Sequence, residues 1–192
     1  MATNYLKKFL RENKQLIINE QFDELYNNAQ NSIGFTIGEL SDCFLAKDFN
    51  PLNKMSSVPS GFMSNSVYTS ELFTIPEGNN IEEIGRFAFK NTKIKTFMIR
   101  EGIKVIETMA FSNSEVLESI YLPSTLEELG NTIFFKSPHI KEIYYNGTYD
   151  EFLKIDRHSD DKKDWFKTLA GRTNSTCILI CKDQTIQLQD KY

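Results

Sequence analysis

Apolar residues recur along the middle of the chain in three copies of one short pattern. Each copy has an apolar residue, two variable residues, a second apolar residue, one variable residue and a third apolar residue. The copies begin 23 residues apart, at Ile94, Leu117 and Ile140. One strand-like pattern in each period of about 20 to 30 residues is typical of a solenoid, in which successive coils stack and their strands form a parallel sheet.

The pattern also predicts which side chains face the core, because successive strand residues point to opposite sides of a sheet. Its apolar positions should face inward, and they include Ile94, Phe97, Ile99, Leu117, Ile120 and Leu122. The residues between them should face outward, with Leu72 and Thr74 as their counterparts in an earlier coil. Stacking gives two outward rows: Leu72, Thr96, Ser119 and Glu142 in the first, and Thr74, Met98, Tyr121 and Tyr144 in the second.

Each period holds a second landmark besides the strand pattern. The corresponding segments are Ile84–Phe89, Ile106–Phe111 and Leu129–Phe135. Proline follows the strand pattern in two copies, at Pro76 and Pro123, where it would end the ladder of backbone hydrogen bonds. A degenerate copy seen in residues 58–62 precedes the others, so we place the repeats at residues 58–148.

Residues 1–57 predict short helices with apolar side chains at helical spacing. The stripes are Leu6, Phe9 and Leu10; Phe22, Leu25 and Tyr26; and Leu40, Cys43 and Phe44. Thr36 and Glu39 form a capping-box pattern before the third stripe, and Asn50-Pro51 should end that helix. Because the terminal coil of a solenoid needs a cap, we expect this N-terminal helical cap to cover the first coil. The sequence leaves open whether it is only a lid or is itself a binding surface.

The period breaks near residue 148, so residues 149–192 are predicted to form a C-terminal α/β cap. Thr148 and Glu151 form a second capping-box pattern, and residues 160–171 predict a further helical turn with Trp165, Phe166 and Leu169. Residues 176–188 predict two strands. Cys177 and Cys181 would lie about 13 Å apart on one strand face, too far for a disulfide, so we expect buried thiols rather than metal ligands.

These features together resemble the BspA-like leucine-rich repeat of bacterial surface antigens. That repeat runs strand, proline, then Ile-Gly-x-x-Ala-Phe, as in Ile75-Pro76 followed by Ile84–Phe89. The family's usual exit is similar to residues 143–148 with Cys181-Lys-Asp183. The resemblance covers residues 58–188 and implies a right-handed α/β leucine-rich-repeat solenoid with a parallel sheet, which binds proteins or other macromolecules and has no catalytic residues. The helical leader adds a resemblance to small leucine-rich-repeat proteins encoded by bacteriophages.

The outward rows are the candidate binding surface for a protein partner. Met98, Tyr121 and Tyr144 would form a stripe of aromatic and sulfur side chains on a flat face, which suits protein recognition. The alternative is a solvated sheet face, since tyrosine is common in strands. We expect a non-enzymatic protein-interaction module. Its sharper form is a phage product that binds and blocks a host defence or regulatory protein, and the alternative is a structural, surface or virion-associated adhesin-like protein.

Composition and charge narrow the classes of partner. The net charge is −4 without a block of lysine and arginine, so nothing indicates nucleic-acid binding. No apolar run reaches the roughly 18 residues that span a bilayer, and charges interrupt the N-terminal residues where a signal peptide would have its apolar core. We therefore expect a cytoplasmic protein without a membrane partner. The sequence has no phosphate-binding loop or nucleophile elbow, so we expect no cofactor and no small-molecule substrate.

One cluster has the residue types of a metal or acid–base site. It comprises Asp156, His158, Asp160 and Asp161. Successive residues of a loop rarely converge on one point, and aspartate is favoured at a helix N-terminus by the helix dipole. We therefore interpret the cluster as a solvated loop, and an enzyme that uses these four residues is the third hypothesis for the function.

Overall fold

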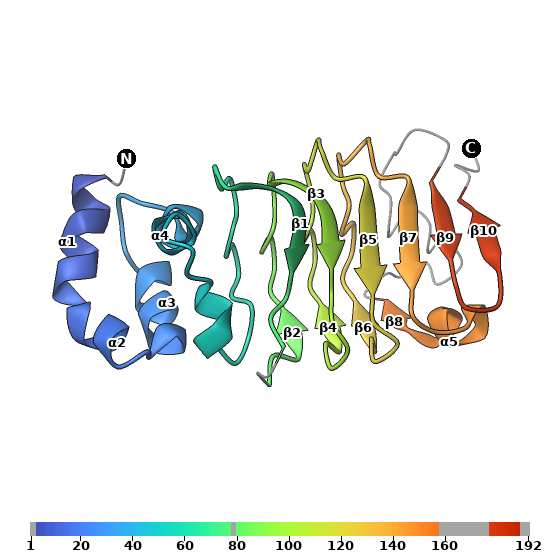
Figure 1. The fold of residues 1–192 in the computed structure, drawn as a ribbon, viewed down its shortest axis with the longest axis horizontal. Helices are drawn as coiled ribbons and strands as arrows, with labels where there is room; N and C mark the ends of the chain where they lie inside the picture. The colour runs from blue at the N-terminus through green and yellow to red at the C-terminus, as the bar shows by residue number, and fades with distance from the viewer. Residues whose placement is uncertain (1–2, 78–79, 158–176, 189–192) are drawn as a thin grey trace.

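The computed structural model describes residues 3–77, 80–157 and 177–188. Helices gather at the N-terminal end, and strands follow one another along the rest of an elongated molecule (Figure 1). A main sheet has the strand order β1-β3-β5-β7-β9-β10, and a narrow sheet has the order β2-β4-β6-β8. The main-sheet strands are β1 (Thr69–Thr74), β3 (Lys93–Met98), β5 (Ser119–Leu122), β7 (Glu142–Tyr145), β9 (Ile178–Ile180) and β10 (Thr185–Gln187). The narrow-sheet strands are β2 (Glu83–Ile84), β4 (Val105–Ile106), β6 (Glu128–Leu129) and β8 (Asp156–Arg157).

Parallel pairing in the main sheet places equivalent residues of successive coils side by side. Phe97 pairs with Ile120, and Ile120 pairs with Ile143, so the 23-residue period of the sequence is also the register of these strands. Both outward rows pair as predicted, from Leu72 and Thr74 on β1 to Glu142 and Tyr144 on β7. The predicted parallel-sheet solenoid is therefore confirmed.

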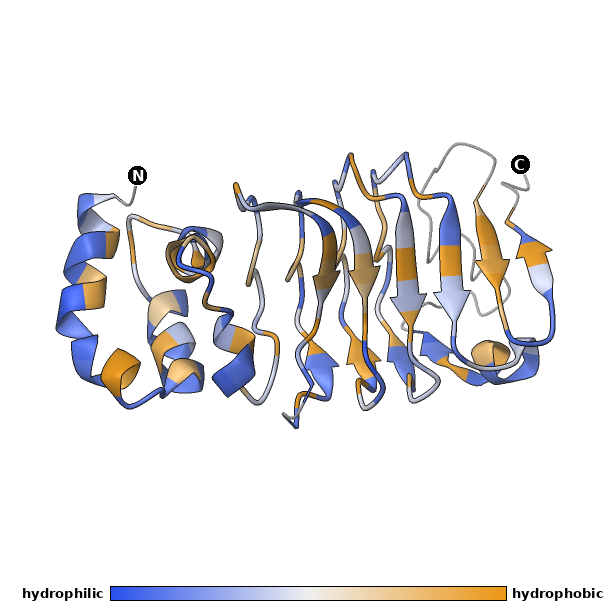
Figure 2. Ribbon diagram, in the orientation of Figure 1, coloured by the Kyte–Doolittle hydropathy of each residue, from blue (hydrophilic) through white to orange (hydrophobic). Residues whose placement is uncertain are grey.

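The core lies between the two sheets and follows the predicted inward positions. All six inward residues predicted from the strand pattern are at most 4% exposed. Half-buried and buried residues alternate along β5 and β7, and Figure 2 shows a hydrophobic band in the middle of each of these strands. A column of buried phenylalanines runs from coil to coil through this core. Its members are Phe62, Phe89, Phe111 and Phe134, with successive ring centroids 6.2, 5.3 and 6.0 Å apart.

The narrow sheet was not predicted from the sequence, because strands of two residues are too short to show alternation. It forms from the start of the second landmark in each coil: Ile84 pairs with Ile106, and Ile106 with Leu129. Val58 bridges to Ile84, and the Met63 N–H donates to the Ala88 carbonyl at 2.6 Å. The degenerate copy is thus a half-coil, which extends the narrow sheet and the phenylalanine column but adds no strand to the main sheet.

The N-terminal helices match the predicted stripes. They are α1 (Asn4–Glu12), α2 (Lys14–Ile18), α3 (Phe22–Gln30) and α4 (Ile37–Leu45), followed by a 3-10 turn at Pro51–Lys54. The capping box of Thr36 and Glu39 is present. Helix α2 was not predicted, and α4 ends at Leu45 rather than at Asn50-Pro51. The early end has a local cause, because Asp48 adopts a left-handed backbone with φ 56° and its N–H turns back to the Leu45 carbonyl at 3.0 Å.

Helix α4 lies directly on the half-coil. The backbone of Gly38 approaches Ser64 so closely that an added Cβ would lie 2.1 Å from the Ser64 carbonyl oxygen. The Ser41 hydroxyl donates to the Phe62 carbonyl, and Tyr26 and Ser41 share a hydrogen bond of 2.8 Å. Asp42 accepts from the Ser66 hydroxyl and from the Val67 N–H. These contacts provide hydrogen-bond partners for the Phe62 carbonyl, the Ser66 hydroxyl and the Val67 N–H at the exposed edge of the first coil.

The C-terminal part continues both sheets. The capping box of Thr148 and Glu151 begins α5 (Tyr149–Lys154), β8 joins the narrow sheet, and β9 and β10 form the predicted pair of strands, antiparallel to each other. Cys177 and Cys181 are buried free thiols, as expected. The predicted helical turn with Trp165, Phe166 and Leu169 lies outside the described residues.

Each coil has a corner residue in the left-handed backbone conformation, and the last one is poorly suited to it. The corner residues are Asn65, Asn91, Asn113 and Lys136, with φ of 53–57°. Asparagine tolerates this conformation better than lysine does. The Asn91 amide also donates to the Asn65 side-chain oxygen at 2.9 Å, whereas the buried side-chain oxygen of Asn113 has no partner among the described residues.

Replacing Lys136 with asparagine should therefore stabilise the protein by about 1 kcal/mol, because it relieves backbone strain and supplies a donor to Asn113. The measurement is the free energy of unfolding in urea. Lys136→Ala is the matched control, which removes the same side chain without adding an amide and should give no gain. Equal stability of the two variants would contradict the explanation.

Candidate functional site

The structure brings the eight predicted outward residues onto one face of the main sheet. Leu72 is 47% exposed and Met98 40% exposed, and Thr74 is also exposed. Thr96, Ser119, Tyr121, Glu142 and Tyr144 are half-buried by their neighbours on the same face. The first row is mainly polar, and its Thr96 and Ser119 hydroxyls lie 3.0 Å apart. The two rows thus differ in character, and the apolar surface lies in the second.

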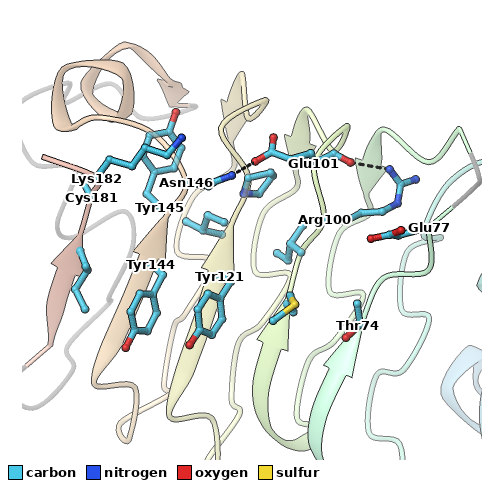
Figure 3. Close-up of a pocket in the computed structure, with 15 residues that line it drawn as sticks. Thr74, Glu77, Arg100, Glu101, Tyr121, Tyr144, Tyr145, Asn146, Cys181 and Lys182 are labelled. Atoms are coloured by element: carbon cyan, nitrogen blue, oxygen red, sulfur yellow. Dashed lines mark hydrogen bonds between the residues drawn. The ribbon is translucent and has the colours of Figure 1, made fainter.

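The second row forms the floor of a groove of about 650 Å³ that crosses the strands near their carboxyl ends. Thr74, Met98, Tyr121 and Tyr144 all line it. Tyr144 pairs with Ile180 on β9, so the row continues one coil further than predicted. The groove is also lined by residues of the loops that follow the strands: Glu77, Arg100, Glu101, Pro123, Asn146 and Lys182. Figure 3 shows Tyr121 and Tyr144 side by side on the floor, with Glu101, Asn146 and Lys182 above them.

Tyr121 and Tyr144 form a rigid pair on the floor of the groove. Their rings stack with centroids 4.3 Å apart and planes 3° from parallel, close to the shortest separation that aromatic pairs favour. The Tyr144 hydroxyl donates to the Glu142 carboxylate at 3.0 Å, and this hydrogen bond raises the pKa of Tyr144. Tyr144 therefore keeps its proton and serves as a fixed, neutral surface rather than as a base.

Glu101 holds the rim of the groove together across three coils. Its carboxylate accepts from the Ser124 N–H at 3.0 Å and hydroxyl at 3.1 Å, from the Thr125 N–H at 3.2 Å, and from the Asn146 side-chain amide. Partial burial alone would raise the pKa of Glu101, but these hydrogen bonds outweigh it and the pKa is lowered. Glu101 is therefore a structural anion, and its negative charge stays beside the apolar floor.

Glu101→Gln should lower the free energy of unfolding at pH 7 by about 1 kcal/mol, at the low end for charge-assisted hydrogen bonds because the residue is exposed to solvent. The folded-state pKa lies below the unfolded value, so the stabilisation is complete above the unfolded pKa and is lost as the pH falls through the folded pKa. Urea unfolding of both proteins at pH 7 and pH 3 should show the difference shrinking in acid. A difference that is independent of pH would contradict this role.

Arg100 replaces the proline that follows the strand in two other coils, and it performs a related structural task. Its guanidinium donates to the carbonyls of Pro76 at 2.7 Å, Glu101 at 2.7 Å and Ile81 at 3.3 Å. It therefore ties its own loop to the preceding coil. The sequence analysis did not identify Arg100, Glu101, Asn146, Ile180 and Lys182 as parts of the groove. Their sequence positions could have indicated three of them. Arg100, Asn146 and Lys182 each come two residues after a residue of the groove floor, namely Met98, Tyr144 and Ile180.

Two cysteines flank strand β9 beside the groove. Burial raises the pKa of Cys177 to about 12 and that of Cys181 to about 11, so both remain thiols at neutral pH. Within residues 3–77, 80–157 and 177–188, no group of three or more His, Cys, Asp and Glu side chains could hold a metal ion. Of the candidate cluster, Asp156 is described, and its carboxylate accepts the Arg157 N–H at 2.8 Å. His158, Asp160 and Asp161 lie outside the described residues.

Comparisons with known proteins agree with this architecture. Residues 39–156 match the family model described as BspA type leucine-rich repeat region, in six copies. No curated protein and no solved structure matches the chain. None of the described helices is long and apolar enough to cross a membrane. Solenoids of leucine-rich repeats generally act as binding scaffolds for proteins. Since the match covers more than half of the sequence, the chain belongs to the BspA-type leucine-rich-repeat family.

Proposed function

We propose that this protein is a non-enzymatic interaction module that binds a protein partner through the outward face of its main sheet. The observation that carries the proposal is the apolar second row, which lies at the bottom of a groove rather than on a flat, solvated surface. Aromatic side chains and methionine are enriched at protein interfaces, and large aromatic residues in a partly enclosed site often contribute most of the binding energy.

The stacked tyrosines add a physical reason for this choice of face. Binding costs conformational entropy whenever a mobile side chain becomes ordered. Tyr121 and Tyr144 are already held by each other and by Glu142, so little of that cost remains. Met98 is 40% exposed, and its flexible side chain can adapt to the surface of the partner. The face thus combines two fixed anchors with one adaptable contact.

The test is a pull-down from a bacterial lysate with the full chain and with a Met98→Ser, Tyr121→Ser, Tyr144→Ser triple variant. We expect the triple variant to lose the captured protein because the apolar floor is removed. A Val116→Ser, Leu153→Ser double variant is the matched control, since these residues are 39% and 43% exposed and do not line the groove. Undiminished capture by a folded triple variant, verified by its melting temperature, would exclude this face.

The finer form of the proposal is a phage product that acts in the bacterial cytoplasm and blocks a host defence or regulatory protein by covering its surface. What supports it is the resemblance of the helical leader and repeats to small phage-encoded proteins. The alternative is an adhesin-like component of a cell surface or virion. Fractionation of producing cells separates the two, because an inhibitor should stay with the cytoplasmic fraction and an adhesin should appear with envelopes or particles.

A further inference from the structure

The groove has an uneven distribution of charge that points to a particular class of partner. We propose that its occupant is an extended segment of a partner protein, with apolar side chains over the second row and an acidic side chain at Lys182. This inference rests on the proposed function and specifies the chemistry of the partner at the same face. It follows from three observations: where the available cation lies, where the acids lie, and how long the apolar floor is.

The backbone of Lys182 is fixed at the β9 end of the groove, and its charge acts on Glu151 through space without forming an ion pair with it. Its backbone N–H donates to the Gly147 carbonyl at 2.9 Å, the residue is exposed, and its side chain makes no ion pair with any described residue. Three other lysines of the solenoid form an ion pair with a glutamate of the preceding coil. These pairs are Lys95 with Glu71, Lys104 with Glu82, and Lys141 with Glu118, at 2.9–3.1 Å.

Acids around the groove already accept hydrogen bonds within the protein, and Asp183, next to Lys182 in the chain, accepts the Tyr149 N–H at 2.8 Å. Hydrogen bonds with Thr148, whose N–H donates to the Glu151 carboxylate at 2.7 Å, are the main cause that lowers the pKa of Glu151, and the charges of Lys154 and Lys182 add to the effect. Glu101 and Glu142 hold negative charges on either side of the floor, and both carboxylates are occupied. An acidic residue of the partner is therefore attracted at the Lys182 end and repelled in the middle. At the β1 end of the groove, Glu77 is negatively charged and Arg100 is positively charged, so this end favours neither an acidic nor a basic residue of the partner.

The length of the floor sets the spacing of the partner's residues. Met98, Tyr121, Tyr144 and Ile180 lie on four adjacent strands, so the row spans about 14 Å at roughly 4.8 Å per strand. An extended peptide advances about 6.6 Å per two residues. Two or three apolar side chains at alternate positions therefore cover the row, and an acidic side chain at the next position on the same side reaches Lys182.

The experiment is selection of a random peptide display library on the immobilised full chain, repeated with Lys182→Glu and with Lys154→Glu. Lys154 is an exposed lysine on α5 that does not line the groove, so its reversal changes the net charge equally. We expect alternating apolar residues followed by Asp or Glu with the unaltered protein and with Lys154→Glu, and Lys or Arg in place of the acid with Lys182→Glu. A selected peptide should bind Lys182→Glu about tenfold more weakly, since an exposed pair is lost and a repulsion is gained.

Each outcome decides the inference. Peptides that need Tyr121 but ignore the reversal at Lys182 would overturn the charge assignment and leave the proposed binding face standing. Absence of any enriched peptide would overturn the extended-segment occupant. Peptides that bind equally well to the Met98, Tyr121, Tyr144 triple variant would overturn both this inference and the proposed function.

Discussion

Phe111→Ala should lower the free energy of unfolding by about 3–5 kcal/mol, the usual cost of removing a fully buried phenylalanine. The Phe111 side chain is 0% exposed, and its ring lies 5.3 Å from Phe89, 4.9 Å from Phe97 and 6.0 Å from Phe134. It therefore joins three coils through both the phenylalanine column and the back of the main sheet. Urea unfolding gives the energy, and hydrogen exchange should show lost protection in β3 and β5.

Phe135→Ala is a matched control for this prediction, because it removes the same side chain one coil further along. Phe135 is half-buried, with the Lys136 ammonium 5.4 Å from its ring. Its loss should cost about 1 kcal/mol or less. Each coil of a solenoid contacts only its neighbours. Comparing the two variants therefore separates the effect of losing a buried ring from the effect of changing any phenylalanine in this part of the solenoid. A similar loss of stability in both would mean that the column does not carry the coupling between coils.

The repeats could be predicted because each inward residue must meet two requirements. A residue such as Ile120 must be apolar to face the core and must also recur at the period that pairs it with Phe97 and Ile143. That double requirement leaves a signal that a single sequence can show. The outward residues Met98, Tyr121 and Tyr144 were located from the same register, although the sequence could not tell that the two tyrosines would stack or that they would lie in a groove.

The remaining parts were hidden by short elements and by a change of period. Strand β9 pairs with β7 through Glu142 and Ile178, which are 36 residues apart rather than 23. Ile180 was therefore not recognised as the end of the second row, and Lys182 was not recognised as part of the groove. The narrow sheet was missed because β2, β4 and β6 each have two residues. These strands are stabilised by the stacking of one coil on the next, and the sequence of a single coil contains no pattern that shows this stacking.

The second prediction concerns Gly38→Ala in the N-terminal cap. Because the cap packs against the first coil, the expected effect is opposite in sign to the effect that helix propensity alone would give. Within an isolated helix this change would be stabilising by about 1 kcal/mol. Here the added Cβ would lie 2.1 Å from the Ser64 carbonyl oxygen and 3.0 Å from its carbonyl carbon. Both atoms belong to the backbone of the half-coil and cannot rotate away. Helix α4 must therefore move outward, and the hydrogen bonds of Ser41 and Asp42 to the half-coil must lengthen or break.

We expect Gly38→Ala to lower the free energy of unfolding by about 2–4 kcal/mol, from overpacking and from the lost hydrogen bonds. Hydrogen exchange should rise in α4 and residues 61–66, while β5 and β7 stay protected. Asn27→Ala, at an exposed position of α3, is the control for propensity and should be neutral or slightly stabilising. A Gly38→Ala protein as stable as Asn27→Ala would mean that α4 can separate from the half-coil at no cost. In that case Phe62 and Met63, which are both 0% exposed, would have to be covered by something other than the cap.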